Sequence, residues 1–385
     1  MENIISPTWA EINLDNLRHN IESFKEKSSI KKISAVIKAN AYGHGAVDVA
    51  REIEDIVDYF SVSSISEGIE LRKSGIKKNI MILTQVEDEY LDYAIKYNIE
   101  PSIFTLNSCK KLNEKLQASG KKLGVHIKLD TGMRRVGFLP NEKSIEDIVE
   151  ISKLENIILE GVFTHFASAD ENDKVFTEKQ FSTFYNMLEK INSKGIKFNI
   201  RHVDNDAAFL MYDFSMDMVR LGIGLYGIYP SSYVKENTKT DLRPVMSLKS
   251  KISYIKDVKK GDTIGYGRTY TAPHDIKVAT IMAGYADGLP RSLSNNGYIL
   301  VGEEKAKILG RICMDQVMVE LKNLNHEIGE TVTIFGDKEI TVNDIADMDN
   351  TISYEILSRI PRRVSRVYKK GGKTTKVVNY LLNNS

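Results

Sequence analysis

The chain of 385 residues is longer than one typical domain of roughly 100–200 residues, so its length favours two domains. Its 53 Lys and Arg nearly balance 52 Asp and Glu, which argues against the basic surplus of proteins that bind nucleic acid or anionic membranes. A content of 42% hydrophobic and 27% charged residues is that of a globular chain and excludes a disordered one.

Further classes are excluded by single features. Cys109 and Cys313 are too few for a disulfide framework or a four-cysteine metal site. A basic region of the kind that opens a secretory signal is missing before Arg18. The charge-free run 221–234 is shorter than the roughly 18–20 residues of a membrane helix. These features predict a cytoplasmic enzyme or binding protein without a membrane or nucleic-acid partner.

Helical and strand-like patterns alternate from about residue 12 to 230. Leu14, Leu17, Ile21 and Phe24 follow the spacing of an amphipathic helix. A second helical stripe, Phe181, Phe184, Leu188 and Ile191, ends at Gly195. Between the helices lie eight short runs rich in β-branched residues, at 34–38, 60–64, 80–84, 101–105, 125–130, 161–165, 200–205 and 218–222. Eight strands with intervening helices predict a (β/α)₈ barrel of the TIM type.

The pattern changes after Pro230. The segment 233–243 is polar and is predicted to be a loop. Short alternating runs punctuated by glycine and proline follow at 246–254, 277–282, 306–312, 317–321 and 331–335. Such runs predict a mostly antiparallel β domain, with the boundary near residue 235.

One glycine motif lies at this junction. Gly222, Gly224 and Gly227 spell G-x-G-x-x-G, which in a dinucleotide-binding fold follows the first strand and opens a helix. Here the motif follows the eighth strand and leads through Pro230 into the polar segment. We therefore do not interpret it as a dinucleotide site.

Side chains at the carboxyl ends of barrel strands face the active site. Reading those ends in order gives Lys38, then Asp130 with Arg135, His165, Asn205 with Asp206, and Arg220 with Gly222. A single lysine there is usually an ion-paired or solvated charge. A lysine, two arginines and a histidine at one mouth favour instead an anionic ligand and a Schiff-base nucleophile, because cationic neighbours lower the pKa of an amine.

Specific segments carry a family resemblance. Residues 36–45, VIKANAYGHG, resemble the segment of alanine racemases to which pyridoxal 5'-phosphate is attached. Further matches follow in order at 130–137, 164–170, 219–223, 284–288, 310–316 and 361–364. The resemblance extends from Thr8 to Tyr368, nearly the whole chain.

The resemblance implies the architecture and the partner. It implies a barrel at 12–235, a β-rich domain formed by 1–11 and 236–385, and a head-to-tail homodimer with shared active sites. The implied reaction is interconversion of L- and D-alanine, which supplies D-alanine for peptidoglycan.

The resemblance also implies two bases. Lys38 would hold the cofactor as a Schiff base and then serve the D face of the substrate. Tyr266 from the other subunit would serve the L face, activated through His165 and Arg220. Two bases suit a racemase, because one proton leaves from one face and another returns to the opposite face.

The remaining roles are carried over residue by residue. Arg220 would face the pyridine nitrogen. Arg135 would pair with the substrate carboxylate or with the phenolic oxygen of the cofactor, and the backbone N–H of Met314 would also bind the carboxylate. The other cofactor-binding positions are Tyr42, Tyr354, Asn205, Asp206, Gly222 and Ile223. In several family members the lysine matching Lys128 is carbamylated and bonds the arginine matching Arg135, so we expect carbamylation of Lys128; an unmodified strand-end lysine is the alternative.

Asp206 is the clearest departure from the family pattern. Its position is usually a serine that donates to the cofactor phosphate, and an ionised carboxylate cannot donate. The carboxyl group turns away from the phosphate, stays protonated, or reports an altered hold on the cofactor. We expect the first outcome, with the phosphate left to the tyrosines and the Gly222 backbone.

Several residues receive no catalytic role. His44, His126 and His202 lack metal-site spacing and are interpreted as structural, so no metal is expected. The basic stretch 362–376 is interpreted as a solvated face, because the whole chain is neutral.

Three alternatives remain open. The first is racemisation of another amino acid such as serine or lysine, although Tyr354 would narrow the pocket in favour of alanine. The second is a non-catalytic pyridoxal-phosphate-binding protein, but such proteins lack a β domain. The third is a barrel aldolase that uses a lysine without a cofactor.

Overall fold

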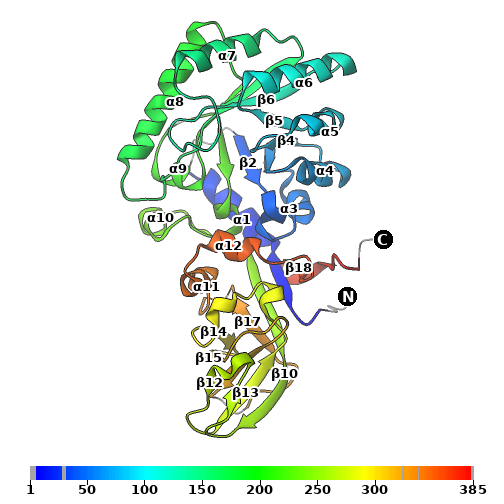
Figure 1. Ribbon diagram of the computed structural model, residues 1–385, viewed down its shortest axis with the longest axis vertical. Helices are drawn as coiled ribbons and strands as arrows, with labels where there is room; N and C mark the ends of the chain where they lie inside the picture. The colour runs from blue at the N-terminus through cyan, green and yellow to red at the C-terminus, as the bar shows by residue number, and fades with distance from the viewer. Residues whose placement is uncertain (1–5, 28–31, 215, 323–324, 337, 383–385) are drawn as a thin grey trace. The chain divides into compact units, whose positions relative to one another are not determined.

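The computed structural model describes residues 6–27, 32–214, 216–322, 325–336 and 338–382. The chain divides into two compact units (Figure 1). The barrel unit contains residues 18–41 and 46–242, and the β unit contains residues 1–17, 42–45 and 243–385. Of the segment 1–11 assigned above to the β-rich domain, residues 1–5 lie outside the described residues.

The barrel unit is built on a sheet of eight parallel strands, as predicted. In chain order they are β2 (Lys32–Val36), β3 (Tyr59–Val62), β4 (Asn79–Ile82), β5 (Glu100–Ile103), β6 (Leu123–Lys128), β7 (Ile157–Phe163), β8 (Ile200–His202) and β9 (Met218–Leu221). Their order in the sheet is β8-β7-β6-β5-β4-β3-β2-β9. Backbone bonds from Asp217 N to Arg201 O (2.9 Å) and from Arg220 N to Asp204 O (3.0 Å) join the two end strands. The sheet is therefore a nearly closed barrel.

Helices and helical turns follow the barrel strands, and the longer helices cover the outer side of the barrel (Figure 1). They are α2 (Lys38–Tyr42), α3 (Ala46–Ile53), α4 (Ile65–Lys73), η1 (Asp88–Tyr90), α5 (Leu91–Tyr97), α6 (Leu106–Ser119), α7 (Glu142–Ser152), α8 (Val175–Ser193), α9 (Asp206–Met211), η2 (Ile223–Tyr226) and α10 (Ser232–Asn237). The short turn η2 lies inside the G-x-G-x-x-G segment, so no long helix opens there.

The two predicted helices are confirmed. The first is α1 (Leu14–Lys25), whose four apolar positions are all buried. The second is α8, which ends just before Gly195, a residue with φ +83. The predicted loop 233–243 is wrong in its first part, because α10 forms there. Ser231 starts α10 by accepting a hydrogen bond from the Val234 N–H, a capping signal that the polar composition concealed.

The β unit contains a nine-stranded sheet, mostly antiparallel as predicted, in the order β13-β16-β15-β14-β17-β10-β1-β18-β19. The strands are β1 (Trp9–Asn13), β10 (Met246–Val258), β13 (Ile276–Ile281), β14 (Tyr298–Val301), β15 (Glu304–Leu309), β16 (Val317–Leu321), β17 (Thr331–Phe335), β18 (Ser365–Lys370) and β19 (Lys373–Val378). The long strand β10 also pairs with β13, which closes six of the strands into a ring. Within the described part of this nine-stranded sheet, β1 and β18 pair in parallel and the other neighbouring strands pair antiparallel.

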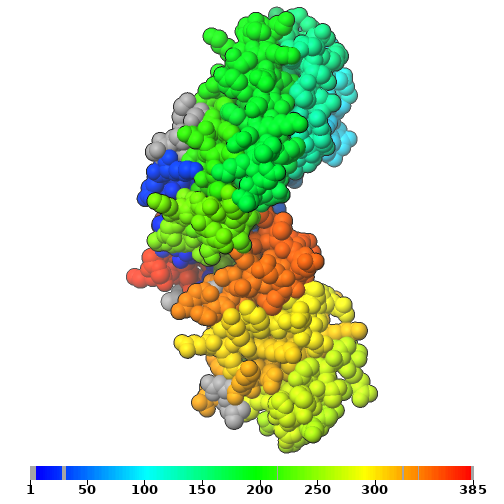
Figure 2. Space-filling view, turned by 90° about the vertical axis from the view of Figure 1, so that its left-hand side faces the viewer, coloured from blue at the N-terminus to red at the C-terminus, as the bar shows by residue number. Residues whose placement is uncertain are grey.

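Short elements complete the β unit. A small hairpin is formed by β11 (Thr263–Ile264) and β12 (Tyr270–Thr271), joined through η3 (Tyr266–Arg268). The helices α11 (Val342–Asp349) and α12 (Ser353–Ser358), orange in Figure 2, lie at the surface. The turn η5 (Arg291–Leu293) contacts α11, and a further turn, η4 (Tyr285–Asp287), precedes it in the chain.

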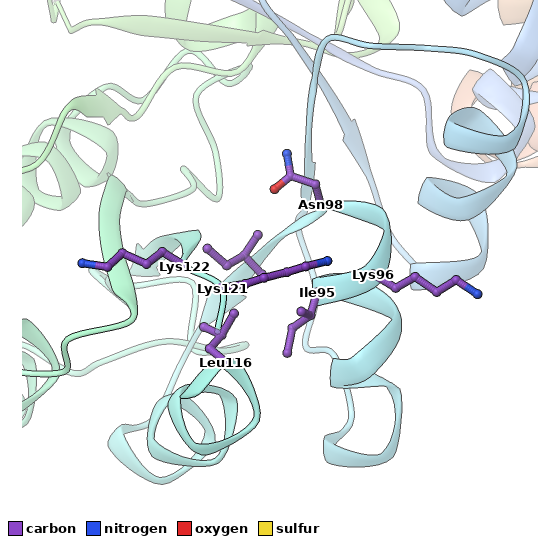
Figure 3. A pocket seen from close by; sticks show the side chains of 7 residues that line it. Ile95, Lys96, Asn98, Leu116, Lys121 and Lys122 are labelled. Carbon is purple, nitrogen blue, oxygen red and sulfur yellow. The ribbon is translucent and has the colours of Figure 1, made fainter. Parts of the chain in front are cut away.

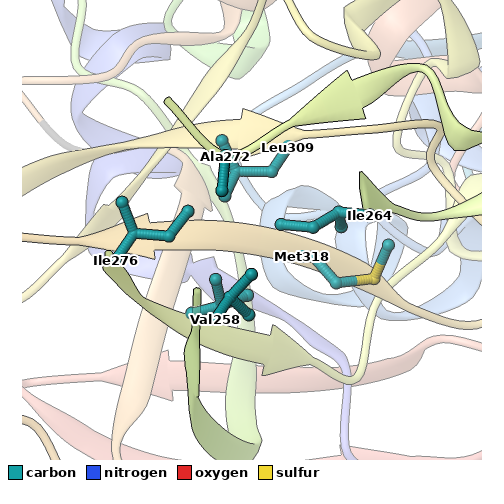
Figure 4. Packing of buried hydrophobic residues seen from close by; sticks show 7 residues of the cluster. Val258, Ile264, Ala272, Ile276, Leu309 and Met318 are labelled. Carbon is teal, nitrogen blue, oxygen red and sulfur yellow. The ribbon is translucent and has the colours of Figure 1, made fainter. Parts of the chain in front are cut away.

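A buried apolar cluster lies beneath this hairpin (Figure 4). Its members are Val258, Ile264, Ala272, Ile276, Val278, Leu309 and Met318. Gly310 allows the backbone of Ile264 to approach closely, because a Cβ at residue 310 would lie 2.6 Å from the carbonyl oxygen of Ile264. The cluster fixes the hairpin and therefore the place of Tyr266.

The basic stretch 362–376 is not simply a solvated face. It forms β18 and β19, and Arg366 within it is fully buried. Its guanidinium donates to the carbonyl oxygens of Gly43, Ile360, Pro361 and Val364 at 2.5–2.9 Å. The interpretation was wrong for Arg366, because backbone carbonyls replace water as its partners.

Candidate functional site

The cations expected at the barrel mouth are brought together by the ends of four strands. Lys38 follows β2, Lys128 ends β6, His165 follows β7 and Arg220 lies in β9. Arg135 lies in the loop after β6. The strands stop earlier than the sequence pattern indicated, so Lys38 and His165 stand just beyond the sheet.

Lys38 opens a turn that the sequence did not predict. Ala39, Asn40, Ala41 and Tyr42 all have φ between +49 and +54, so α2 is a left-handed turn. Each non-glycine residue costs about 1–2 kcal/mol in this conformation. Local bonds hold the turn: the Asn40 side chain accepts from Ala46 N at 3.0 Å. Strain of this kind is typical of functional positions.

Glu67 supports the same turn. Its Oε1 accepts a hydrogen bond from the Ala39 N–H at 2.6 Å, and its Oε2 accepts from the Ser63 and Ser64 N–H groups. Glu67 was missed by our sequence reasoning. The signal was present, because Ser64 and Glu67 form a capping box at the start of α4.

The amine of Lys38 is prepared for nucleophilic chemistry. Burial and then the charge of Arg135 lower the pKa of Lys38, while Glu67 acts in the opposite direction. A lowered pKa leaves more neutral amine at neutral pH, and only the neutral amine attacks a carbonyl group.

Arg220 is held rigidly inside the barrel. Its Nη1 donates to His202 Nδ1 and to the His202 carbonyl oxygen, both at 2.9 Å. Its Nη2 donates to the carbonyl oxygens of Thr164 (2.9 Å) and Val203 (3.0 Å). Burial lowers the pKa of Arg220 to about 10, so the guanidinium still carries its charge at neutral pH. Arg220 is therefore a fixed, buried cation.

His165 and Lys128 lie in the field of this cation. Burial and the surrounding cations lower the pKa of His165 well below its ordinary value, so its ring is neutral. Those cations are Arg220, Arg135, Lys128 and Lys38. The Nη2 of Arg220 lies 3.5 Å from His165 Nδ1. Burial, with Arg220 and Arg135 adding to it, lowers the pKa of Lys128 to about 7, and its amine donates to the Leu129 carbonyl oxygen at 2.9 Å.

Asp206 lies against the backbone of Gly222. Both of its carboxylate oxygens lie 3.0 Å from the Gly222 backbone nitrogen, so the carboxyl group accepts from the N–H group that was expected to hold the phosphate. Burial raises the pKa of Asp206 to about 7, while backbone N–H groups including those of Gly222 and Ile223 act to lower it. Where the carboxyl group lies when a phosphate is bound stays a prediction.

Asn205 has a structural task in this arrangement. Its side-chain oxygen accepts from the Ala208 N–H at 2.9 Å and thereby caps the start of α9.

Tyr42 and Tyr354 belong to the β unit. Their ring centres lie 6.1 Å apart, and Tyr42 is buried. The short segment 42–45 is held there by the bonds from Arg366 to the Gly43 carbonyl oxygen and from the Tyr368 hydroxyl to the His44 carbonyl oxygen at 3.0 Å.

Tyr266 and Met314 are exposed members of the predicted set, as is Arg135. Tyr266 is 71% exposed and Met314 is 53% exposed. The loop around Met314 is anchored through its backbone, since the Met314 carbonyl oxygen accepts from Ala286 N at 3.0 Å.

A cavity of about 300 Å³ lies elsewhere in the barrel unit (Figure 3). It is bounded by the ends of α5 and α6 and the start of β6, at the amino ends of the strands. Its lining contains none of the predicted residues and consists of Ile95, Lys96, Asn98, Leu116, Lys121, Lys122 and Leu123.

Two kinds of feature are absent from the described part of the chain. Its histidine, cysteine and acidic residues form no group suited to a metal ion. None of its helices has the length and apolar character needed to cross a membrane.

The geometry defines a class first: a barrel protein with a buried amine among fixed cations, followed by an antiparallel β domain. Residues 12–230 match the profile of the alanine racemase N-terminal domain, and residues 245–368 match that of the alanine racemase C-terminal domain. The chain belongs to the alanine racemase family.

Individual relatives cover the whole chain. Alanine racemase 1 of Clostridium acetobutylicum is 43% identical over 98% of this chain and 99% of its own length. The solved alanine racemase of Clostridium difficile 630 is 46% identical with a TM-score of 0.95, covering 99% of this chain and all of its own. A histidine racemase from Leuconostoc mesenteroides is 30% identical with a TM-score of 0.87, covering 96% and 99%.

Proposed function

We propose that this chain interconverts L- and D-alanine with pyridoxal 5'-phosphate bound at the barrel mouth. The observation that carries the proposal is the position of Lys38, a mostly buried amine with a lowered pKa beside Arg135. Such an amine condenses with an aldehyde at neutral pH. The full-length relatives named alanine racemase support the choice of reaction.

The donor groups fit a phosphorylated aromatic cofactor, with one reservation. The phosphate would be held by the backbone N–H groups of Gly222 and Ile223 and by the hydroxyl groups of Tyr42 and Tyr354. Neutral donors of this kind commonly bind a phosphate. Asn205 borders the same turn. Asp206 fits only when it is protonated or displaced, because its carboxylate would repel the phosphate.

The cofactor, when bound, withdraws electrons from the substrate α-carbon and makes its proton removable. Arg220 would face the pyridine nitrogen as a fixed cation, held by the Thr164 and Val203 carbonyl oxygens. His165 stays neutral beside it and so can accept a hydrogen bond.

Two residues would carry out the proton transfers at the substrate α-carbon. The Nζ of Lys38 would remove or add a proton on the D face, and the Tyr266 hydroxyl group would do so on the L face. Arg135 and the Met314 backbone N–H would orient the substrate carboxylate.

We infer a homodimer in which each β unit serves the partner's barrel. Exposed Tyr266 and Met314 support this inference, because tyrosine and methionine are enriched where protein surfaces meet. Activity per chain should fall on dilution below the dimer dissociation constant. A fully active monomer in sedimentation experiments would refute the shared site.

We infer that Lys128 is carbamylated. Its neutral amine attacks the carbon of CO₂, an N–C bond forms, one C–O π bond opens and the departing proton goes to solvent. The product anion would lie near Arg135 and Arg220, which already act on this amine. Labelled bicarbonate should give a carbamate signal in carbon-13 NMR that Lys128→Gln lacks. A spectrum without that signal means an unmodified lysine.

One experiment tests the proposal as a whole. The purified protein should be yellow, lose its colour on borohydride reduction and carry the added mass on Lys38. Chiral analysis should then show racemisation of alanine. Serine, lysine and histidine are assayed in parallel, because a 30% identical relative is named histidine racemase. A larger kcat/KM for one of these would replace alanine as the substrate. Labelling without turnover would indicate a cofactor-binding protein, and Lys38 reacting without a cofactor would indicate an aldolase.

We place the enzyme in the cytoplasm. The support is that Cys109 and Cys313 are both free thiols.

A further inference from the structure

A chain of ionisable side chains runs through the barrel interior from Arg220. His202 Nδ1 accepts from the Arg220 guanidinium at 2.9 Å. His202 Nε2 lies 3.0 Å from His126 Nδ1, and His126 Nε2 lies 2.9 Å from Glu100 Oε2. All four residues are less than 9% exposed, and Glu100 is the first residue of β5. Barrel interiors are ordinarily filled by apolar branched residues, so this polar chain calls for a reason.

The two ends fix the direction of every hydrogen bond. A guanidinium only donates, so His202 Nδ1 carries no proton and its Nε2 must carry one. His126 therefore accepts at Nδ1 and carries its proton at Nε2, which donates to the carboxylate of Glu100. Both rings are neutral, and a cation and an anion close the chain.

The surrounding packing is shaped to this chain. The His202 ring stacks on Phe163 with centres 4.8 Å apart, and the His126 ring meets His202 edge-on at 5.1 Å. Gly161 makes room for His126, because a Cβ there would lie 2.0 Å from His126 Nδ1. Burial and then Arg220 lower the pKa of His202 well below its ordinary value, in keeping with a neutral ring.

We propose that Glu100, His126 and His202 form a one-directional hydrogen-bond relay that positions Arg220 and offsets its buried charge from the opposite end of the barrel. They are positioning residues, since they act on the cofactor only through Arg220. This inference rests on the proposed function, in which Arg220 faces the pyridine nitrogen. A buried cation needs hydrogen bonds and a counter-charge. Asp204 and Asp206 act on the charge of Arg220 directly, and the relay adds hydrogen bonds that are polarised in one direction towards the carboxylate of Glu100.

The first test needs neither cofactor nor turnover. In the apoprotein labelled with nitrogen-15 histidine, the directions of these hydrogen bonds place the ring proton of both His126 and His202 on Nε2. A ring protonated at both nitrogens, or only at Nδ1, overturns the relay. Because this test does not involve alanine, it stands even when racemisation is not observed.

The second test separates the charge of the Glu100 side chain from its shape. Glu100→Gln keeps an acceptor oxygen for His126 but removes the negative charge. We expect kcat to fall about tenfold, as for other residues that orient an active-site group from behind it, with KM for alanine nearly unchanged. The control is Glu160→Gln, since Glu160 accepts from Tyr59 and Asn199 but has no bond to the relay. Equal losses in the two variants overturn the proposal.

The third test asks whether the charge acts through the rings. In a His126→Phe background, Glu100→Gln should cost little further activity, because the link is already broken. An unchanged tenfold cost there would show that Glu100 acts independently of the relay. If His126→Phe does not fold, the tautomers of the unaltered protein decide the question.

Discussion

The barrel unit and the β unit hold their candidate residues in opposite ways. Arg220 is buried and bonded to carbonyl oxygens and His202, and Lys38 sits on a strained turn that Glu67 supports. Tyr266 and Met314 are exposed, although the cluster beneath the Tyr266 hairpin is tightly packed. Within one chain, the barrel unit holds its charged groups by burial and hydrogen bonds, while the β unit leaves Tyr266 exposed to solvent. Burial shifts the pKa of a charged group, whereas the hydroxyl group proposed to serve a second copy of the chain would need to be accessible.

In the barrel unit, loss of Lys38 should have the largest effect on racemisation. Lys38→Ala removes the cofactor attachment and one base together, so racemisation should fall by roughly 10⁴-fold or more. The variant should sediment as the unaltered protein does, because Lys38 lies beyond the end of β2 and outside the sheet. Racemisation near the unaltered rate would show that the amine lies elsewhere.

In the β unit, loss of the Tyr266 hydroxyl group should slow proton exchange on one face of the substrate only. In deuterated solvent, Tyr266→Phe should slow exchange of the α-proton of L-alanine by about 10²–10³-fold, while D-alanine continues to exchange through Lys38. Racemisation itself should slow equally in both directions, because mirror-image substrates have an equilibrium constant of one. Tyr254→Phe, on the exposed face of β10, is the control. Equal slowing of exchange for both enantiomers would argue against a face-specific base.

Replacing Asp206 tests how the buried charge in the barrel unit affects the affinity for the cofactor. Asp206→Ser frees the Gly222 N–H and restores a donor, so the dissociation constant for pyridoxal phosphate should fall by roughly tenfold at pH 8. The gain should shrink towards pH 6, where protonation of Asp206 removes the repulsion in the unaltered protein. Fluorescence titration of both apoproteins across pH measures this. Weaker binding by the serine variant would mean that the carboxyl group is a used contact.

The same variant makes a prediction for stability. The pKa of Asp206 is raised by burial to about 7 in the folded protein, above about 3.9 in the unfolded chain. Ionisation therefore opposes folding increasingly as pH rises from about 4 to 7, and fully above 7. The midpoint of thermal unfolding of Asp206→Ser should exceed that of the unaltered apoprotein by more at pH 8 than at pH 5. A difference that does not vary with pH would mean that the carboxyl group stays ionised throughout.

The smallest effect is expected at Glu67. Glu67→Gln keeps an acceptor for the Ala39 N–H but removes the charge that opposes the lowering of the Lys38 pKa. The pKa of Lys38 should fall further, and reductive modification of Lys38 near neutral pH should accelerate about threefold. The measurement is the pH profile of that modification. A raised pKa would show that Glu67 does not act on Lys38 by charge.

The periodic patterns of the sequence predicted the regular elements of the fold, but features that depend on a single contact between distant residues were not predicted. Strand periodicity located the eight barrel strands and hence the side chains at their ends. The left-handed turn after Lys38 was not predictable from propensity, because its support comes from Glu67, a residue on another element. The contact of Asp206 with the Gly222 N–H group depended on the fold of a separate segment, and burial of Arg366 depended on carbonyl oxygens, of which that of Gly43 is distant along the chain.

The bonds from Arg366 and Tyr368 to residues 43 and 44 also set an order of events during synthesis. These partners are separated by more than 320 positions in the chain. The segment that follows Lys38 therefore cannot reach its final state until the last strands have left the ribosome, even though the barrel strands around it are made early. Loop closure over such a separation is slow, and the lysine turn remains unsupported on one side meanwhile. Competence to bind a cofactor would then be acquired only when the chain is complete, which protects a half-made protein from trapping a reactive aldehyde.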